Sequence, residues 1–156
     1  MKKYVFIFIS VLLLGTMLTG CYYNGGSSAE CKFHTKTIKM QVASNEWQFD
    51  QNEQRWYCHF KRSDITSSIY QYGSWTISRE YNSGTNTAFL VALPESVYKT
   101  EVINNAPVYY TQHIDYAVGI GWVEITLTNS DHIYAEDAQG YLIAPEAMTF
   151  VMQITY

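Results

Sequence analysis

Apolar and polar residues alternate along most of the chain from Lys36 onward. This period of two is typical of strands that bury one face, and no window after residue 20 has the spacing of an amphipathic helix. In the segment 55–61, for example, Trp56, Cys58 and Phe60 share one face. The pattern predicts strands at 37–42, 47–49, 55–61, 65–70, 75–79, 89–93, 108–118, 122–127 and 148–156.

The segments between these strands complete the expected architecture. Gly119-Ile120-Gly121 predicts a hairpin between its two flanking strands. Residues 97–106 look irregular and predict a long loop or one helical turn, and residues 129–144 form a polar excursion. Short strands with one buried face favour an all-β fold, namely a single antiparallel β-sandwich domain over residues 36–156.

The first 20 residues have the character of a secretory signal. Two lysines follow the initiator methionine, and the run from Tyr4 to Leu14 is apolar except for Ser10. That run is shorter than the ~20 apolar residues that a membrane-spanning helix needs. We therefore expect residues 1–20 to be removed on export.

The end of this leader, Leu18-Thr19-Gly20-Cys21, resembles the lipobox of bacterial lipoproteins. The resemblance implies that the Cys21 sulfur receives a diacylglyceryl group and that its freed amine receives a further acyl chain. Two or more chains give stable membrane anchoring. The alternative is a plain signal peptide with an incidental cysteine. Residues 21–35 are rich in Gly and Ser near their start and predict a flexible tether.

Charge and composition narrow the classes of partner. Without the leader the chain keeps eight Lys and Arg against 14 Asp and Glu, a formal charge of −6. The absence of a basic patch argues against nucleic-acid binding. Cys31 and Cys58 remain as a pair that either forms a disulfide in an exported chain or stays as two free thiols.

Several short stretches together resemble a family of small uncharacterised bacterial lipoproteins. The stretches are Asp64 to Tyr70, Gly73, Leu93-Pro94, Ile114-Asp115-Tyr116, Gly121 and Phe150 to Ile154. The match runs from about Trp47 to the C-terminus, although Met152-Gln153 departs from the family's basic, valine-rich ending. The resemblance implies a β-sandwich and an envelope location, and it brings no catalytic residue.

The sequence holds no G-x-S-x-G, H-E-x-x-H, P-loop or G-x-G-x-x-G motif. The cluster Asp131, His132, Glu136 and Asp137 could hold a divalent ion, but a solvated acidic loop is the favoured interpretation. His113 and Asp115 share one strand face and permit a catalytic site without arguing for one. We expect no metal and no cofactor.

Aromatic side chains are the other candidate for recognition. Tyr109, Tyr110 and Trp122 could contribute to a surface that stacks on sugars or peptides, although core and cross-strand packing is the favoured interpretation of the aromatics. Tyr109 and Tyr110 must point to opposite faces of a strand.

These observations predict a non-enzymatic, lipid-anchored protein of the cell envelope. We expect it at the outer membrane, on the periplasmic face or the cell surface, with a glycan or a protein as its ligand. The alternatives are a hydrolase that uses His113 or His132 with carboxylates, and a subunit of a surface assembly joined by β-strand addition.

Overall fold

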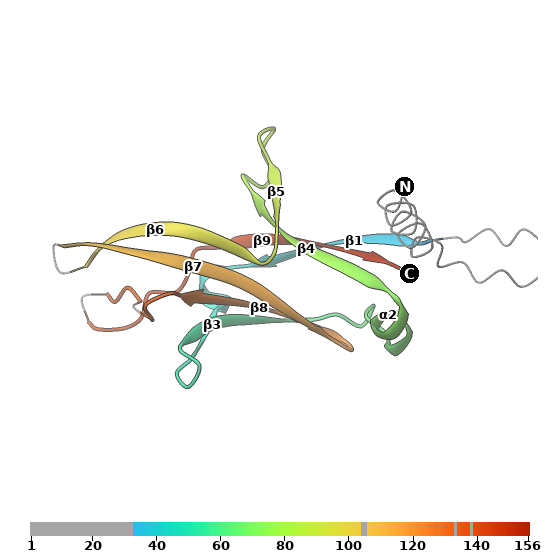
Figure 1. Ribbon diagram of the computed structural model, residues 1–156, viewed down its shortest axis with the longest axis horizontal. Coiled ribbons are helices and arrows are strands. Elements are labelled where there is room, and N and C mark those ends of the chain that lie inside the picture. The colour runs from blue at the N-terminus through green and yellow to red at the C-terminus, as the bar shows by residue number, and fades with distance from the viewer. Residues whose placement is uncertain (1–32, 104–105, 133, 138) are drawn as a thin grey trace, which may run out of the picture. The chain divides into compact units, whose positions relative to one another are not determined.

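Two antiparallel sheets pack against each other and enclose one hydrophobic core (Figure 1). The computed structural model describes residues 33–103, 106–132, 134–137 and 139–156. The predicted signal peptide, the lipobox and Cys31 lie outside the described residues. Residues 34–156 form one structural unit. The prediction of an all-β antiparallel sandwich is confirmed.

The four-stranded sheet has the order β1-β9-β4-β5, and the five-stranded sheet has the order β2-β3-β8-β7-β6. The bounds of the first sheet are Thr35–Val42 (β1), Met148–Thr155 (β9), Ser74–Tyr81 (β4) and Phe89–Ala92 (β5). Those of the second are Gln48–Asp50 (β2), Arg55–Lys61 (β3), Trp122–Asn129 (β8), Ala106–Gly119 (β7) and Glu95–Ile103 (β6). A 3-10 helix at Ser44–Glu46 and the short helix α2 at Ser67–Tyr72 connect strands.

The core follows from the period of two in the central strands. Strand β9 buries Met148, Phe150, Met152 and Ile154, and strand β8 buries Val123, Ile125 and Leu127. Full burial of such a side chain contributes roughly 1.5–3 kcal/mol. The inward residues of these two strands therefore supply much of the energy that holds the sheets together.

The hairpin between β7 and β8 is confirmed, with a shorter turn than the sequence suggested. Gly119 pairs with Trp122, so Ile120 and Gly121 alone form the turn. Gly121 has a φ of 82°, a left-handed conformation that glycine adopts without strain. The indole ring of Trp122 covers Gly119 so closely that a Cβ there would lie 2.2 Å from it.

The predicted strand at 65–70 is wrong, because residues 67–72 form α2. The Thr66 hydroxyl accepts a hydrogen bond from the Ile69 amide and caps the helix. Ile65, which precedes this cap, is buried, and Ile69 within the helix is half-buried.

The irregular segment expected at 97–106 is also wrong, since residues 95–103 form the edge strand β6. Here the usual alternation is inverted. Lys99 and Glu101 are half-buried, whereas Tyr98 is exposed. A strand whose inner face carries charges does not show the apolar period by which strands are recognised.

The two ends of this sandwich differ in the elements that they bring together. The α2 end brings together the start of β1, the end of β9 and the start of β4, because Thr155 pairs with both Thr35 and Ser74. The β7–β8 turn joins this end through the Gly121 amide, which donates to the Ile65 carbonyl over 2.9 Å. The opposite end, which holds the start of β9, is called the cavity end.

Candidate functional site

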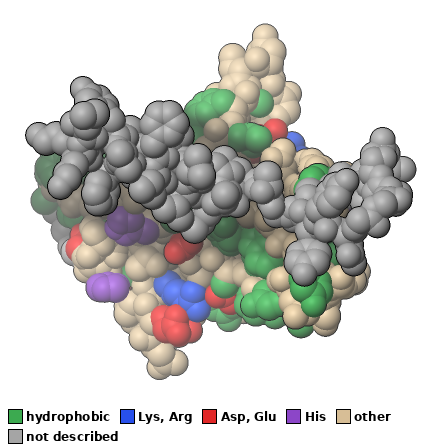
Figure 2. All heavy atoms as spheres, turned by 45° about the vertical axis from the view of Figure 1, so that its right-hand side comes forward, with side chains coloured by type: hydrophobic (Ala, Val, Ile, Leu, Met, Phe, Trp, Pro, Cys, Tyr) green, Lys and Arg blue, Asp and Glu red, His purple; other side chains and the backbone are tan. Residues whose placement is uncertain are grey.

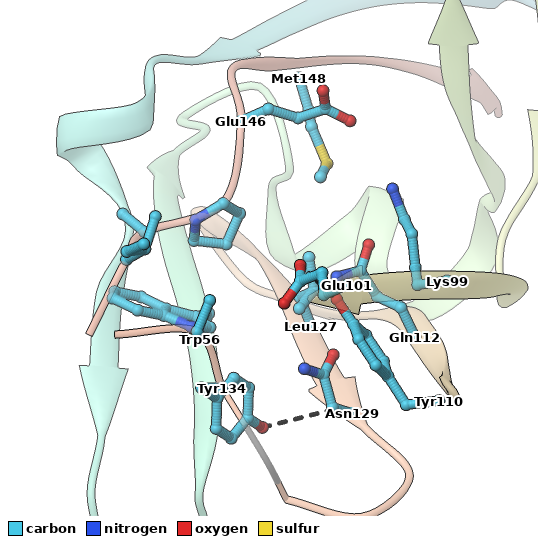
Figure 3. A pocket seen from close by; sticks show the side chains of 14 residues that line it. Trp56, Lys99, Glu101, Tyr110, Gln112, Leu127, Asn129, Tyr134, Glu146 and Met148 are labelled. Carbon is cyan, nitrogen blue, oxygen red and sulfur yellow. Dashed lines mark hydrogen bonds between the residues drawn. The ribbon is translucent and has the colours of Figure 1, made fainter. Parts of the chain in front are cut away.

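A cavity of about 220 Å³ opens at the cavity end, between the two sheets and the loop that precedes β9 (Figure 3). Its lining combines apolar, polar and charged side chains. They are Trp56, Lys99, Glu101, Tyr110, Gln112, Leu127, Asn129, Tyr134, Ala135, Ile143, Ala144, Pro145, Glu146 and Met148.

One wall of the cavity comes from the inner face of β6 and β7. Lys99 and Tyr110 are directly opposed in the ladder. Glu101 lies two residues to one side of this pair, and Gln112 lies two residues to the other side, because the strands are antiparallel. The Tyr110 hydroxyl donates to Glu101 Oε1 over 2.6 Å. Burial, together with this bond to a carboxylate, raises the pKa of Tyr110, so its hydroxyl remains a donor.

Two polar groups on this wall have no partner within the described residues. Gln112 is only 9% exposed, and its Oε1 has no hydrogen-bond partner there. Within the same residues, the Lys99 ammonium makes no ion pair or hydrogen bond, even with Glu101 in the same cavity. An unsatisfied buried polar group costs about 1–3 kcal/mol. The wall therefore presents a hydrogen-bond acceptor, Gln112 Oε1, and a cation, the Lys99 ammonium, that no other described residue binds.

The facing wall is aromatic and held by its own contacts. Phe49 meets Trp56 and Tyr134 edge-on, with ring centroids 5.1 Å and 5.0 Å away. The Tyr134 hydroxyl donates to the Gln54 carbonyl and accepts from the Asn129 amide over 3.4 Å, the bond drawn in Figure 3. Burial raises the pKa of Tyr134. These contacts fix the positions of the rings in the aromatic wall.

A charge network centred on a buried arginine holds the loop beside the cavity. Arg79 is 6% exposed, and its Nη2 lies 3.0 Å from Glu146 Oε1. Its Nη1 donates to the Tyr81 hydroxyl, which in turn donates to Glu95 Oε1 over 2.5 Å. Burial and the Glu95 carboxylate raise the pKa of Tyr81 to about 12. The loop is also tied down by a bond from Trp47 Nε1 to the Glu146 carbonyl.

The structure separates the three aromatic residues singled out in the sequence. Tyr110 lines the cavity, whereas Tyr109 is exposed on the outer face and stacks on Tyr98, with ring centroids 6.1 Å apart. Trp122 lies at the α2 end beside His59. Tyr109 and Tyr110 do point to opposite faces, as expected.

Sequence reasoning missed the charged and amide members of the site, Lys99, Glu101 and Gln112. The available signal was the alternation within 95–101, where charged residues take every inward position except that of Val97. An edge strand with charges on its inner face suggests that the space it borders is polar.

The histidines lie outside this cavity. His113 is exposed on the outer face of β7, with its Nδ1 2.8 Å from the Ser96 hydroxyl, and Asp115 accepts from the Tyr116 amide. His132 lies in the loop with a φ of 57° and borders a separate hollow with Glu136. In the part of the chain that the structure describes, no three His, Cys, Asp or Glu side chains are grouped to hold a metal.

Cys58 is buried in the core and forms no disulfide among the described residues, and burial raises its pKa to about 12. Its predicted partner Cys31 lies outside the described residues, as does Cys21, so the disulfide and the lipid attachment stay predictions.

Within the described ranges, no helix has the length and apolar character to cross a membrane. Comparisons with protein-family models, curated proteins and solved structures gave no match to this chain.

Proposed function

We propose that this chain is a lipid-anchored protein of the cell envelope that binds a small polar ligand in the cavity and does not catalyse a reaction. The observation that carries the proposal is the wall formed by Lys99, Glu101 and Gln112. It presents a cation and a buried acceptor that no described residue satisfies.

The chemistry of the wall defines the ligand. The Lys99 ammonium donates up to three hydrogen bonds and favours a carboxylate, whereas Gln112 Oε1 and Glu101 accept from N–H or O–H groups. Because Lys99 and Glu101 do not pair with each other, a ligand can engage both. The end of a short peptide and a carboxylated sugar each carry a carboxylate and donors at the scale of this cavity.

Calorimetric titration with three probes tests this proposal: the dipeptide Ala-Ala, N-acetylneuraminic acid and the uncharged N-acetylglucosamine. At least one of the two carboxylated probes should bind, and Lys99→Met should weaken that binding by about tenfold, the effect of one lost charged contact. Lys39→Met is the matched control, because Lys39 pairs with Glu80 on the surface away from the cavity. Binding that is unchanged in Lys99→Met, or absent for both carboxylated probes, would refute the proposal.

The envelope location rests on the leader and on Leu18-Thr19-Gly20-Cys21. Cells fed a fatty acid with a detectable tag should label the wild-type chain and leave Cys21→Ala unlabelled. Persistent label on the variant would contradict attachment at Cys21.

The edge strand β6 supports a second candidate function, the capture of a partner strand. Strand β6 pairs with β7 alone. Pro107, which has no N–H, faces Val102, so Val102 occupies a non-hydrogen-bonded position and its backbone polar groups point away from β7. The same orientation holds for Ser96, Tyr98 and Thr100 by alternation. None of these four positions carries a charged side chain.

A proline at an outward position tests this second function. Thr100→Pro removes one outward N–H and leaves the ladder between β6 and β7 intact. If a strand is added at this edge, a partner that copurifies with the wild type should be lost from Thr100→Pro and kept by Thr100→Val. Retention of the partner by both variants would rule out pairing along β6.

A further inference from the structure

The α2 end carries a cluster of exposed aromatic and aliphatic side chains. Tyr72 is 78% exposed and Ile120 is 55% exposed, and Tyr70 and Tyr156 are each close to half exposed. Tyr70 stacks on the half-buried Trp75, with ring centroids 5.7 Å apart. These five residues are called the aromatic end surface below. Large exposed apolar clusters of this kind mark interaction sites.

Four separate parts of the chain build this surface. They are α2, the start of β4, the β7–β8 turn and the C-terminal end of β9, and Figure 1 shows all four together at its right-hand side. Thr155 pairs with Ser74, the neighbour of Trp75, and the Gly121 amide bonds to Ile65, which precedes α2. Figure 2 brings this end forward and shows hydrophobic side chains gathered at its lower right.

The two ends of the sandwich differ in their charged side chains. At the α2 end, Lys36 and Arg62 share the single carboxylate of Asp64, at 3.2 Å and 2.9 Å, and Lys61 is exposed beside them. Most carboxylates of the described residues gather toward the cavity end, at Glu46, Asp50, Glu53, Glu101, Asp131, Glu136, Asp137 and Glu146. Three cations therefore lie beside the single carboxylate of Asp64 at the α2 end.

The position at which the chain enters the domain points to the same end. Strand β1 begins at Thr35, which follows Cys21 by 14 residues and pairs with Thr155 at the α2 end. A segment of that length spans at most about 50 Å when fully extended. A lipid on Cys21 would hold the α2 end within that distance of the bilayer.

We propose that the aromatic end surface rests on the lipid bilayer and that the cavity faces away from it. Tyrosine and tryptophan rings favour the boundary between headgroups and acyl chains, because they combine an apolar body with a polar tip. Lysine and arginine beside them are attracted to anionic headgroups. This inference rests on the proposed lipid anchor, and it adds a contact made by the folded domain itself.

Single-tryptophan variants of the full chain test the orientation. Trp75 is retained alone in one variant, and Trp56, at the cavity, is retained alone in the other; the remaining tryptophans become phenylalanine. Both variants are reconstituted into vesicles of phosphatidylethanolamine and phosphatidylglycerol, roughly 3:1, with and without brominated acyl chains. The brominated chains should lower Trp75 fluorescence at least about twofold and leave Trp56 unchanged, since only interfacial rings meet the acyl chains.

Vesicle flotation in the same samples separates this inference from the anchor. A chain that floats with quenched Trp75 supports the docking surface. A chain that floats with Trp75 unquenched, or with both tryptophans quenched alike, overturns the docking surface and leaves the anchor standing. A chain that does not float overturns both.

A second measurement avoids the multiple tryptophan replacements. Vesicles should slow amide hydrogen exchange in α2 and in the β7–β8 turn of the wild type. The double variant Tyr70→Ser, Tyr72→Ser should lose this protection, whereas its matched control Tyr98→Ser, Tyr109→Ser should keep it, because that exposed pair lies on the outer face of β6 and β7. Equal protection in the two double variants would overturn the proposed surface.

Discussion

Arg79 places its guanidinium 3.0 Å from the Glu146 carboxylate, although the arginine side chain is 7% exposed and the glutamate side chain is 63% exposed. The arginine stands on the inner face of a sheet and also lies over the Tyr81 ring, 4.3 Å from its centroid. The pair is therefore asymmetric: one charge is desolvated in the core and the other comes from the loop that borders the cavity.

This asymmetry predicts different costs for the two halves of the pair. Glu146→Gln leaves the buried guanidinium without its counter-ion and should lower the free energy of unfolding by about 1–2 kcal/mol, less than in a fully buried pair because Glu146 is exposed. Arg79→Met removes the buried charge itself and should cost less than about 1 kcal/mol. Urea unfolding of both variants measures the difference. A larger loss in Arg79→Met would mean that the network, rather than charge burial, dominates.

Cys58 should be inert to thiol reagents in the folded protein. Its burial and its raised pKa of about 12 leave little accessible thiolate at neutral pH. Unfolding in guanidinium without a reductant should expose one thiol more in the wild type than in Cys58→Ala. One thiol fewer in the unfolded wild type than in unfolded Cys58→Ala would instead indicate a bridge between Cys58 and Cys31, because the variant then carries the Cys31 thiol free.

The stability of the short helix α2 should depend on the residues at its two ends, Thr66 and Gly73. Thr66→Ala removes the cap to the Ile69 amide and should cost about 1 kcal/mol, while Thr66→Ser keeps the oxygen and should be nearly neutral. Gly73→Ala would place a Cβ 2.6 Å from the Ile69 carbonyl oxygen, so the backbone must shift, at a cost of about 1–3 kcal/mol. Chemical denaturation of the three variants tests this order.

Asp64 should make the protein more stable above pH 4 than below it. Burial tends to raise the pKa of this carboxyl, but hydrogen bonds from Arg62 and Lys36 outweigh burial and lower the pKa. The ionised form therefore stabilises the fold above the unfolded-state pKa of about 3.9, and this contribution is lost as pH falls through the lower folded-state pKa.

The corresponding measurement compares the free energy of unfolding of the wild type and Asp64→Asn at pH 6 and near pH 2. The difference in the free energy of unfolding between the two proteins should be smaller near pH 2 than at pH 6. Asp115→Asn is the control, because Asp115 has no Lys or Arg partner among the described residues. A gap that stays constant with pH would show that the effect of Asp64 is not electrostatic.

The period of two predicted the sandwich well where one sheet face is apolar, as in β8 and β9. It failed for β6, because Lys99 and Glu101 occupy inward positions beside a cavity, and it failed at α2, because two isoleucines four residues apart do not distinguish a short helix from a strand. The candidate site was missed partly because β6, which carries Lys99, was not predicted as a strand. In addition, its residues come from strands that meet only in the folded sheet, and Gln112 and Lys99 belong to no sequence motif.

The pairing of β1 with β9 has a mechanical consequence. The chain enters β1 at Thr35, at the α2 end, and the ladder runs from there to Val42 beside the cavity end. A force applied between the segment before Thr35 and a ligand bound in the cavity would act along β1. The hydrogen bonds between β1 and β9 would then be loaded in shear, all at the same time. The domain is thus built to resist tension along the line from its entry point to its cavity, and should yield more readily to a pull that peels β1 sideways.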